Sequence, residues 1–269
     1  MSDSPDYIDG ISNYCDRWCE RCPFTRRCRS FSFEVKIKAK LEKGDDFNQA
    51  FWEAFEETTD NFENPTGGLT GDFELEEAED DELAAILGEY SSEIDEFGEG
   101  VDQELKRKSL KNHPISIRSR AYAFDIDKFQ KKCEFISFNE DGSVTIAASQ
   151  EGVEIDSHER KVSLEDAFEA IWFYHLFIHV KLTRAFQGRV LYDYEEDDGF
   201  PKDSDGSAKV ALIAIDRSIA AWKSMHSCLH HKRNDIAQYI LTLTIIRKQV
   251  EEFFPDARAF VRPGFDTEK

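Results

Sequence analysis

The chain has 269 residues, of which 40% are hydrophobic and 13% aromatic, and it carries a formal net charge of −21. This length is enough for one large domain or two small ones, each with a hydrophobic core that needs no disulfide bonds. Charged residues interrupt every apolar stretch before it reaches the roughly 18 residues of a membrane span, so no contact with a membrane is expected. The acidic balance makes nucleic acid an unlikely general partner, because phosphate groups would be repelled.

Four cysteines near the amino terminus have the spacing C-x3-C-x2-C-x5-C: Cys15, Cys19, Cys22 and Cys28. Four thiolates are a complete ligand set for one metal centre. The first three stand at i, i+4 and i+7, so a short helix would project their sulfurs from one face. Pro23 disfavours helix at Cys22, and the chain can then loop back to bring in Cys28. The spacing therefore predicts a four-cysteine metal module over residues 1–35.

The residues before the cysteines indicate the cellular compartment of the protein. The first ten contain three aspartates and neither a basic residue nor an apolar run, so they lack the features of a secretory signal. A cytoplasmic protein is therefore expected. In that reducing compartment, clustered cysteines more often bind metal than form disulfides. The alternative is that the four cysteines are small buried apolar side chains without a metal.

The spacing leaves the identity of the metal open. Zinc is usually held by two C-x2–4-C pairs, whereas here three closely spaced sulfurs precede a distant fourth. A [4Fe-4S] cluster held by four cysteines is the alternative. The first three cysteines share the C-x3-C-x2-C spacing of radical SAM enzymes, but the residues that follow have a helical pattern instead of the α/β barrel which that family requires. Zinc is the first expectation and an iron–sulfur cluster the second.

Five arginines are interleaved with these cysteines: Arg17, Arg21, Arg26, Arg27 and Arg29. Positive charge favours a thiolate over a thiol, so the arginines are expected to lower the pKa of the cysteines. Alternatively, they bind an acidic partner or the acidic segment of the same chain.

A helix and an acidic segment follow the cysteines. Phenylalanines at helical spacing from about Leu41 to Phe62 predict that residues 36–64 form an amphipathic helix that packs on the helical bundle. The stretch Asp72 to Glu104 contains fifteen acidic residues and neither lysine nor arginine. Apolar residues at helical spacing within it indicate that residues 65–105 form an acidic linker or helix.

Residues 106–269 are predicted to form a helical bundle with about four core helices. The first opens at His113 and Pro114 and continues to about Lys132, and within it Arg118 and Asp125 are expected to form a buried ion pair. Alternation between residues 134 and 149, around an Asn-Glu-Asp-Gly turn, predicts a short β-hairpin.

Capping signals mark the remaining helices. Ser163 and Asp166 form an approximate capping box for a long helix that ends near Gly188. The next helix is expected from Asp205 or Ser207 to about Cys228, and the last from Asn234 or Asp235 to Pro255. A tail with Phe260, Val261 and Phe265 is expected to pack back on the protein. The predicted fold class is mainly α: a helical bundle of antiparallel neighbours and an amino-terminal helix, with a small four-cysteine metal module and one hairpin.

Two histidine pairs stand at i, i+4, His175 with His179 and His226 with His230. With Glu169 and Asp216 they suggest a second metal site within the bundle, but the Glu-x-x-His motif of ferritin-like sites is missing. Hydrogen-bonded packing histidines are the preferred interpretation of the first pair, and complementation of a helix carboxyl end is preferred for the second. Whether the four histidines bind a metal is left open.

The sequence contains no catalytic motif from which a reaction could be identified. A glycine-rich phosphate loop is missing, and Cys133 and Cys228 are isolated cysteines without the neighbours of a nucleophile. The expected function is that of a metal-binding accessory or interaction protein whose partner is a protein. The alternative is an iron–sulfur redox or electron-transfer protein, with an oxidoreductase as the leading option if the protein is an enzyme.

Overall fold

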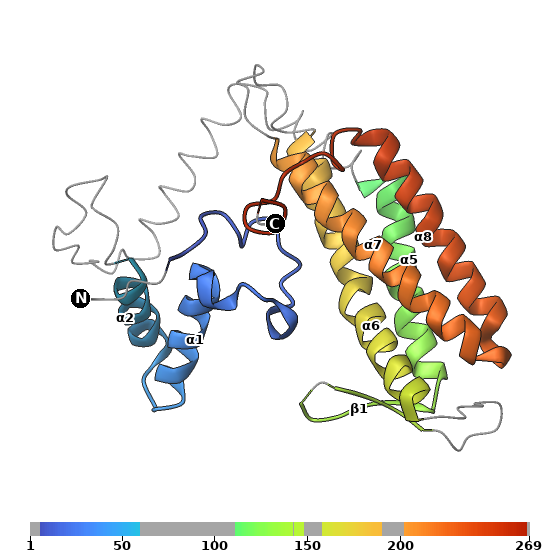
Figure 1. Cartoon of the computed structure of the whole chain (residues 1–269), viewed down its shortest axis with the longest axis horizontal. Coiled ribbons are helices and arrows are strands. Elements are labelled where there is room, and N and C mark those ends of the chain that lie inside the picture. The colour runs from blue at the N-terminus through green and yellow to red at the C-terminus, as the bar shows by residue number, and fades with distance from the viewer. Residues whose placement is uncertain (1–5, 60–110, 142, 148–157, 190–201, 268–269) are drawn as a thin grey trace, which may run out of the picture. The chain divides into compact units, whose positions relative to one another are not determined.

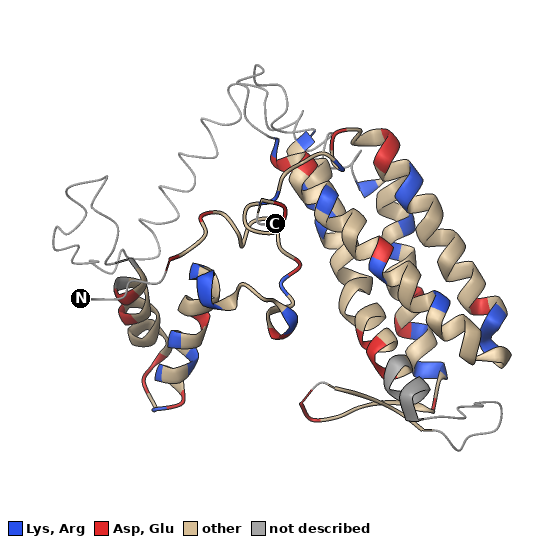
Figure 2. Ribbon diagram, in the orientation of Figure 1, with Lys and Arg blue, Asp and Glu red and all other residues tan. Residues whose placement is uncertain are grey.

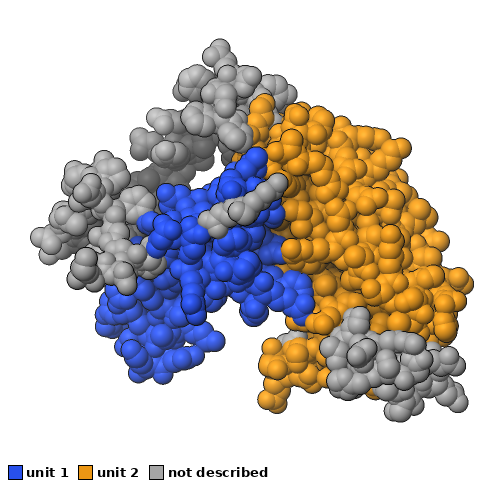
Figure 3. Space-filling model, in the orientation of Figure 1, with its two compact units in different colours: residues 1–102, 261–269 blue, residues 103–260 orange. Residues whose placement is uncertain are grey.

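The computed structural model describes residues 6–59, 111–141, 143–147, 158–189 and 202–267. The chain divides into two compact units, one formed by residues 1–102 and 261–269 and the other by residues 103–260 (Figure 3). The described residues are mainly helical and contain one two-stranded sheet (Figure 1), which confirms the predicted mainly α fold. The acidic stretch over residues 65–105 lies outside the described residues.

Four long helices make up most of the second unit: α5 (Pro114–Lys132), α6 (His158–Gln187), α7 (Asp203–Cys228) and α8 (Arg233–Phe253). They lie side by side, with α5 beside α6 and α8, and α7 beside the same two helices (Figure 1). Arg184 near the end of α6 pairs with Asp203 at the start of α7, at 2.9 Å. The ring of His113, just before α5, lies 5.2 Å from that of Phe253 at the end of α8. Neighbouring helices are therefore antiparallel in a bundle-like arrangement.

Aromatic side chains from all four helices fill the core. Tyr122 on α5 and Trp222 on α7 are fully buried, and the indole N–H of Trp222 donates to the Tyr122 hydroxyl at 3.0 Å. The ring of Phe129 lies 5.3 Å from Trp222 and 6.4 Å from Phe168 on α6. Tyr239 on α8 completes the cluster, 4.9 Å from Trp222. Burying large apolar side chains at about 1.5–3 kcal/mol each favours this packing.

The start of α5 agrees with the prediction, because His113 is the N-cap and Pro114 the first helical residue. The Nδ1 atom of His113 accepts a hydrogen bond from the Ile115 amide at 3.4 Å. The predicted buried pair of Arg118 and Asp125 is wrong. Arg118 donates to Gln249 on α8 at 2.8 Å, whereas Asp125 pairs with Lys128 on the exposed side of its own helix. The two residues are seven apart and have different neighbours.

The ends of the other helices agree with the prediction better than their starts do. The predicted ends at Gly188 and Cys228 match α6 and α7 to within one residue, and α8 ends just before Pro255. However, α6 begins at His158, so the predicted cap at Ser163 lies inside the helix. Residues 158–162 contain no helix breaker and extend the helix toward the amino terminus.

The predicted hairpin is confirmed. Strands β1 (Ile136–Phe138) and β2 (Val144–Ile146) pair antiparallel, with Ile136 opposite Ile146. Ile146 is fully buried, and its amide donates to the Glu165 carboxylate on α6 at 2.9 Å. The hairpin therefore packs against the beginning of α6 and covers that end of the core.

The first unit contains two shorter helices, α1 (Arg29–Leu41) and α2 (Phe47–Thr59), which pack against each other. The sequence predicted one helix from about Leu41 to Phe62, and α2 accounts for its central part. The helix α1 was not predicted. Its apolar residues occupy alternate positions from Phe31 to Leu41, a period typical of a strand, and none of them is fully buried. The alternation of its apolar residues therefore did not point to a helix.

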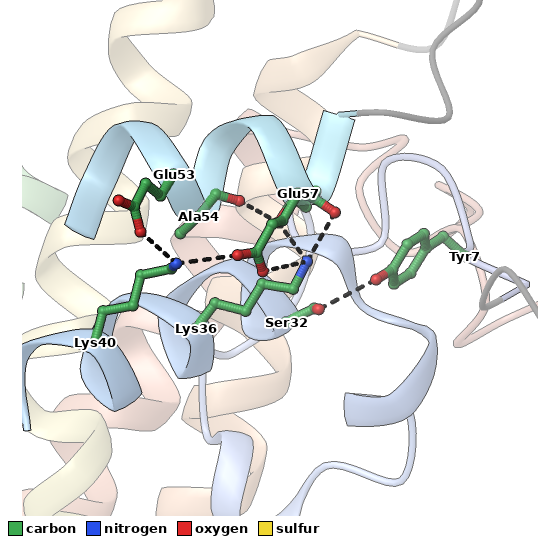
Figure 4. Close-up of polar contacts among 8 residues, drawn as sticks. Tyr7, Ser32, Lys36, Lys40, Glu53, Ala54 and Glu57 are labelled. Carbon is green, nitrogen blue, oxygen red and sulfur yellow. Dashed lines mark hydrogen bonds and ion pairs between the residues drawn. The ribbon is translucent and has the colours of Figure 1, made fainter. Parts of the chain in front are cut away.

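Charged side chains join α1 to α2 (Figure 4). The Lys40 ammonium lies 2.7 Å from the Glu53 carboxylate and 3.0 Å from that of Glu57. The Lys36 ammonium donates to the backbone carbonyl of Glu57 at 2.8 Å. Figure 2 shows the matching pattern, with basic positions along α1 and acidic ones along α2. The Tyr7 hydroxyl donates to Ser32 at 3.1 Å and so ties the amino-terminal segment to α1.

Candidate metal site

The cysteine segment is not the short helix that its spacing predicted. Two 3-10 helices of three residues each, η1 (Cys19–Arg21) and η2 (Thr25–Arg27), are separated by turns. Arg17 has a φ angle of 62°, a left-handed conformation that no right-handed helix can include. The chain therefore changes direction between Cys15 and Cys19, and the predicted helical face of three sulfurs is wrong.

The four predicted ligands nevertheless come together. Cys15, Cys19, Cys22 and Cys28 all line one small cavity, with a volume of about 20 Å³. All six cysteines of the chain are free of disulfide bonds. Thus the turns bring the four cysteines to one cavity without the predicted helix.

Apolar side chains from distant parts of the sequence complete the wall of this cavity. Ile11 and Trp18, which are 3% and 8% exposed, line it from the amino-terminal side. Phe265 lines it from the carboxy-terminal tail, and its ring packs edge-on against Phe24 at 5.0 Å. The expectation that Phe265 packs back is confirmed. No pattern in the sequence indicated that its neighbours would be the cysteines, because these residues are far apart along the chain.

A glycine allows the tail to approach. Gly264 has a φ of 75°, and a Cβ atom built there would lie 2.9 Å from the Cδ1 atom of Ile11 and 3.0 Å from that of Ile8. Arg262 and Asp266 close this turn of the tail with an ion pair at 3.0 Å. The amino-terminal segment is fixed in turn by the Ile8 amide, which donates to the carbonyl of Arg27 at 3.0 Å.

The electrostatics of Cys19 differ from the prediction. Burial is the largest cause that raises the pKa of its thiol to about 11, and Glu34, Cys15 and Cys22 raise it further. Cys15 and Cys22 are thus near enough to Cys19 to affect its ionisation. The expectation that neighbouring arginines lower the pKa is wrong for Cys19.

The arginines have other partners. Arg17 lies 3.7 Å from the Glu34 carboxylate, and Arg27 lies 3.1 Å from that of Asp6. The guanidinium of Arg21 lies over the ring of Trp18. Their charge is therefore directed toward carboxylates and rings. The alternative partner, the acidic segment of this chain, lies outside the described residues.

The four cysteines line one cavity, but this alone does not make them a complete ligand set. Zinc–sulfur bonds are about 2.3 Å long, so the sulfurs of a bound site must approach one point closely. Within the described ranges, no group of three or more His, Cys, Asp or Glu side chains is arranged so that it could hold a metal ion. The four thiols line the cavity without forming such a group.

The histidines of the first pair bind protein groups. The Nδ1 atom of His175 contacts the carbonyl oxygen of Trp172, and its Nε2 atom lies 3.3 Å from Asp127 on α5. His179 places its Nδ1 atom 2.9 Å from the Ser119 hydroxyl. Because the two rings have separate partners, these contacts favour the interpretation of both as packing histidines.

The other residues of the suggested second site are also separated. His226 lies in the last turn of α7, and His230 begins the 3-10 helix η4 (His230–Lys232). Asp216 pairs with Arg247 at 3.2 Å and with Arg258 at 2.7 Å. No metal-binding group that includes these histidines, Glu169 or Asp216 occurs in the described part of the chain.

Among the described helices, none combines the length and the apolar character needed to cross a membrane. Comparisons of the chain with protein-family models, with curated proteins and with solved structures found no match.

Proposed function

We propose that this protein is a metal-binding accessory protein in which Cys15, Cys19, Cys22 and Cys28 hold one structural zinc ion. The observation that carries the proposal is that all four cysteines line the same cavity although the segment is not helical. Four sulfurs complete the tetrahedral coordination of a structural zinc site and leave no open position for a substrate.

The size of the cavity favours a single ion over an iron–sulfur cluster. Its volume of about 20 Å³ corresponds to little more than one water-sized group. A [4Fe-4S] cluster has four irons and four sulfides and needs considerably more space. Binding a single ion requires the thiols to turn further into the cavity, whereas binding a cluster requires the two 3-10 helices to separate.

A structural role for the metal is supported because few buried residues stabilise the cysteine segment. Neither of the 3-10 helices η1 and η2 contains a fully buried residue, and the same is true of α1. Short segments of this kind gain folding free energy when a metal joins them. Cys28 is also the N-cap of α1, so a metal held by Cys28 would tie the start of this helix to the cavity.

An accessory role with a protein partner is supported by the surface of α2. Phe47, Trp52 and Phe55 are 62%, 61% and 45% exposed, and their neighbour Phe51 packs against all three rings. Exposed aromatic clusters are typical of surfaces that bind other proteins.

Metal analysis of the full chain tests the proposal. Protein purified without air, without chelators and without a metal-affinity tag is expected to contain about one zinc per chain by mass spectrometry. Replacement of one ligand, Cys28→Ser, should lower the zinc content at least severalfold and weaken the remaining binding. Cys228→Ser is the matched control, because Cys228 lies at the end of α7 and does not line the cavity.

Two outcomes contradict the zinc proposal. Equal zinc content in Cys28→Ser and in the unchanged protein, or none in either, would show that the cysteines are not the ligands. Iron with sulfide, together with a brown colour and broad visible absorption that Cys28→Ser removes, would replace the zinc site by an iron–sulfur redox centre.

A further inference from the structure

A larger cavity lies in the second unit, between the first half of α5 and the last turns of α6. Its volume is about 480 Å³, which lies within the range of small-molecule sites. It is lined by two basic side chains, three neutral polar ones, one histidine and one aromatic ring: Lys111, Arg120, Ser116, Thr183, Gln187, His179 and Phe186. Among the described residues, no acidic side chain lines it.

The two basic groups of this cavity have no counter-ion within the described residues. Arg120 and Lys111 make neither an ion pair nor a hydrogen bond there, whereas Arg118 on the same helix donates to Gln249. Both side chains are exposed, so a ligand from solution can reach their charges. Two cations at the wall of one cavity attract a ligand with up to two negative charges.

A serine hydroxyl adds a second polar group to the wall of the cavity. Ser116 is only 7% exposed and lines the cavity, and its hydroxyl has no hydrogen-bond partner among the described residues. Because the Ser116 oxygen is not among the buried unpaired atoms of the described residues, it is accessible and can form a hydrogen bond with a ligand atom in the cavity. The Gln187 side-chain amide at the same wall is a further donor.

His179 contributes an uncharged ring to the wall of the cavity. Burial, followed by the charge of Arg120, lowers the pKa of its imidazole, so the ring is neutral at pH 7. Its Nδ1 atom is engaged with Ser119, which leaves Nε2 as the ring atom available for other contacts. Phe186, fully buried at the same wall, supplies apolar surface for the uncharged part of a ligand.

We infer that this cavity binds a small phosphate ester, with the phosphate between Arg120 and Lys111 and within reach of the Ser116 hydroxyl. Arginine suits a phosphate because its planar guanidinium donates two parallel hydrogen bonds. The remaining volume accommodates a small organic group beside Phe186. The inference depends only on the second unit and is independent of the cysteine site.

Calorimetric titration of the full chain with glycerol 3-phosphate tests this inference, with inorganic phosphate and glycerol as companion probes. Glycerol 3-phosphate is expected to bind in a saturable manner, more tightly than inorganic phosphate, and glycerol is expected not to bind. Arg120→Gln should weaken binding by about tenfold to a hundredfold, as expected when a charge-assisted hydrogen bond is lost. Lys111→Gln should also weaken it.

Arg118→Gln is the matched control, because it removes the same charge from the same helix outside the cavity. It should leave the affinity within about twofold. Equal weakening by Arg118→Gln and Arg120→Gln would mean general charge attraction and would overturn the inference, as would the lack of saturable binding by the unchanged protein. If Arg120→Gln does not fold, the affinity for glycerol 3-phosphate is measured in Lys111→Gln and Ser116→Ala instead. Unchanged affinity in both variants would contradict the proposed site.

Discussion

Cys22 and Cys28 occupy equivalent positions in two successive turns. Each directly follows a 3-10 helix of three residues, and each donates its backbone N–H to the carbonyl of the first residue of that helix, at 3.2 Å to Cys19 and 3.3 Å to Thr25. Repeating one turn in this way brings two sulfurs to the same cavity from separate stretches of chain. The spacing C-x5-C is therefore compatible with one site even though it is longer than that of an ordinary zinc pair.

Phe265→Ala should loosen the cysteine segment. The change removes a ring that lines the cysteine cavity and packs edge-on against Phe24, an aromatic contact that contributes about 0.5–1.5 kcal/mol beyond its buried area. Alkylation of Cys15, Cys19, Cys22 and Cys28, followed by peptide mass spectrometry, is expected to accelerate severalfold. Val261→Ala, at a tail residue that is 57% exposed, should leave the rates unchanged. Equal rates in both variants would show that the tail does not protect the thiols.

Gly264→Ala should destabilise the same segment by about 1 kcal/mol or more. The added methyl group meets Ile11 and Ile8 at about 3 Å and also forces a side chain into a left-handed conformation. Gly44→Ala separates the two effects, because Gly44 has a φ of 99° but no atom within 4 Å of its added Cβ. Hydrogen exchange of the Ile8 amide, which is bonded to Arg27, should accelerate in the Gly264 variant alone. Unchanged exchange there would contradict the close approach of the tail.

Tyr122→Phe should destabilise the second unit by about 1–3 kcal/mol, because the buried indole N–H of Trp222 loses its acceptor. The destabilisation is measured as the change in free energy of unfolding by urea, followed by circular dichroism. Tyr239→Phe is the control, since the Tyr239 ring packs in the same cluster but its hydroxyl makes no hydrogen bond within the described residues. It should change the stability by less than about 0.5 kcal/mol. An equal loss in both variants would exclude a specific role for the hydrogen bond.

The α1–α2 pair should weaken in acid. Hydrogen bonds from Lys40 are the largest cause that lowers the pKa of both Glu53 and Glu57 from the ordinary value of 4.5. A carboxylate with a lowered pKa stabilises the folded state above pH 4.5, and this contribution is lost as the pH falls through the lowered pKa. The same contacts raise the pKa of Lys40 above 10.5, so the pairing persists to alkaline pH.

Lys40→Met should raise the pKa of both glutamates toward 4.5, as measured by NMR of the side-chain carboxyl carbons. Gln49 still lowers the pKa of Glu53 in this variant, and Lys36 still lowers that of Glu57. Lys38→Met is the control, because Lys38 is exposed on the same helix and has no ion pair in the described chain. If the pKa values of Glu53 and Glu57 in the Lys40 variant equal those in the unchanged protein, groups other than Lys40 lower them.

Local signals in the sequence determined much of the second unit. A proline at the first helical position fixed the start of α5, and glycine and proline fixed the ends of α6 and α8, because these residues act on the backbone of their immediate neighbours. The same reasoning failed for α1, whose apolar residues alternate with period two, and for the start of α6, where the pattern of a cap occurs inside a helix.

The spacing of the cysteines, by itself, identified four candidate ligands but predicted the wrong backbone for them. Helical periodicity assumes that every residue between two positions is right-handed, and a single left-handed residue, Arg17, removes that assumption. Only the tertiary structure brought Phe265 to the cysteine cavity, gave the arginines partners other than the sulfurs, and placed Arg120, Lys111 and Ser116 around a second cavity. These relationships depend on contacts between segments far apart in the chain, and no local pattern encodes which distant side chains will meet.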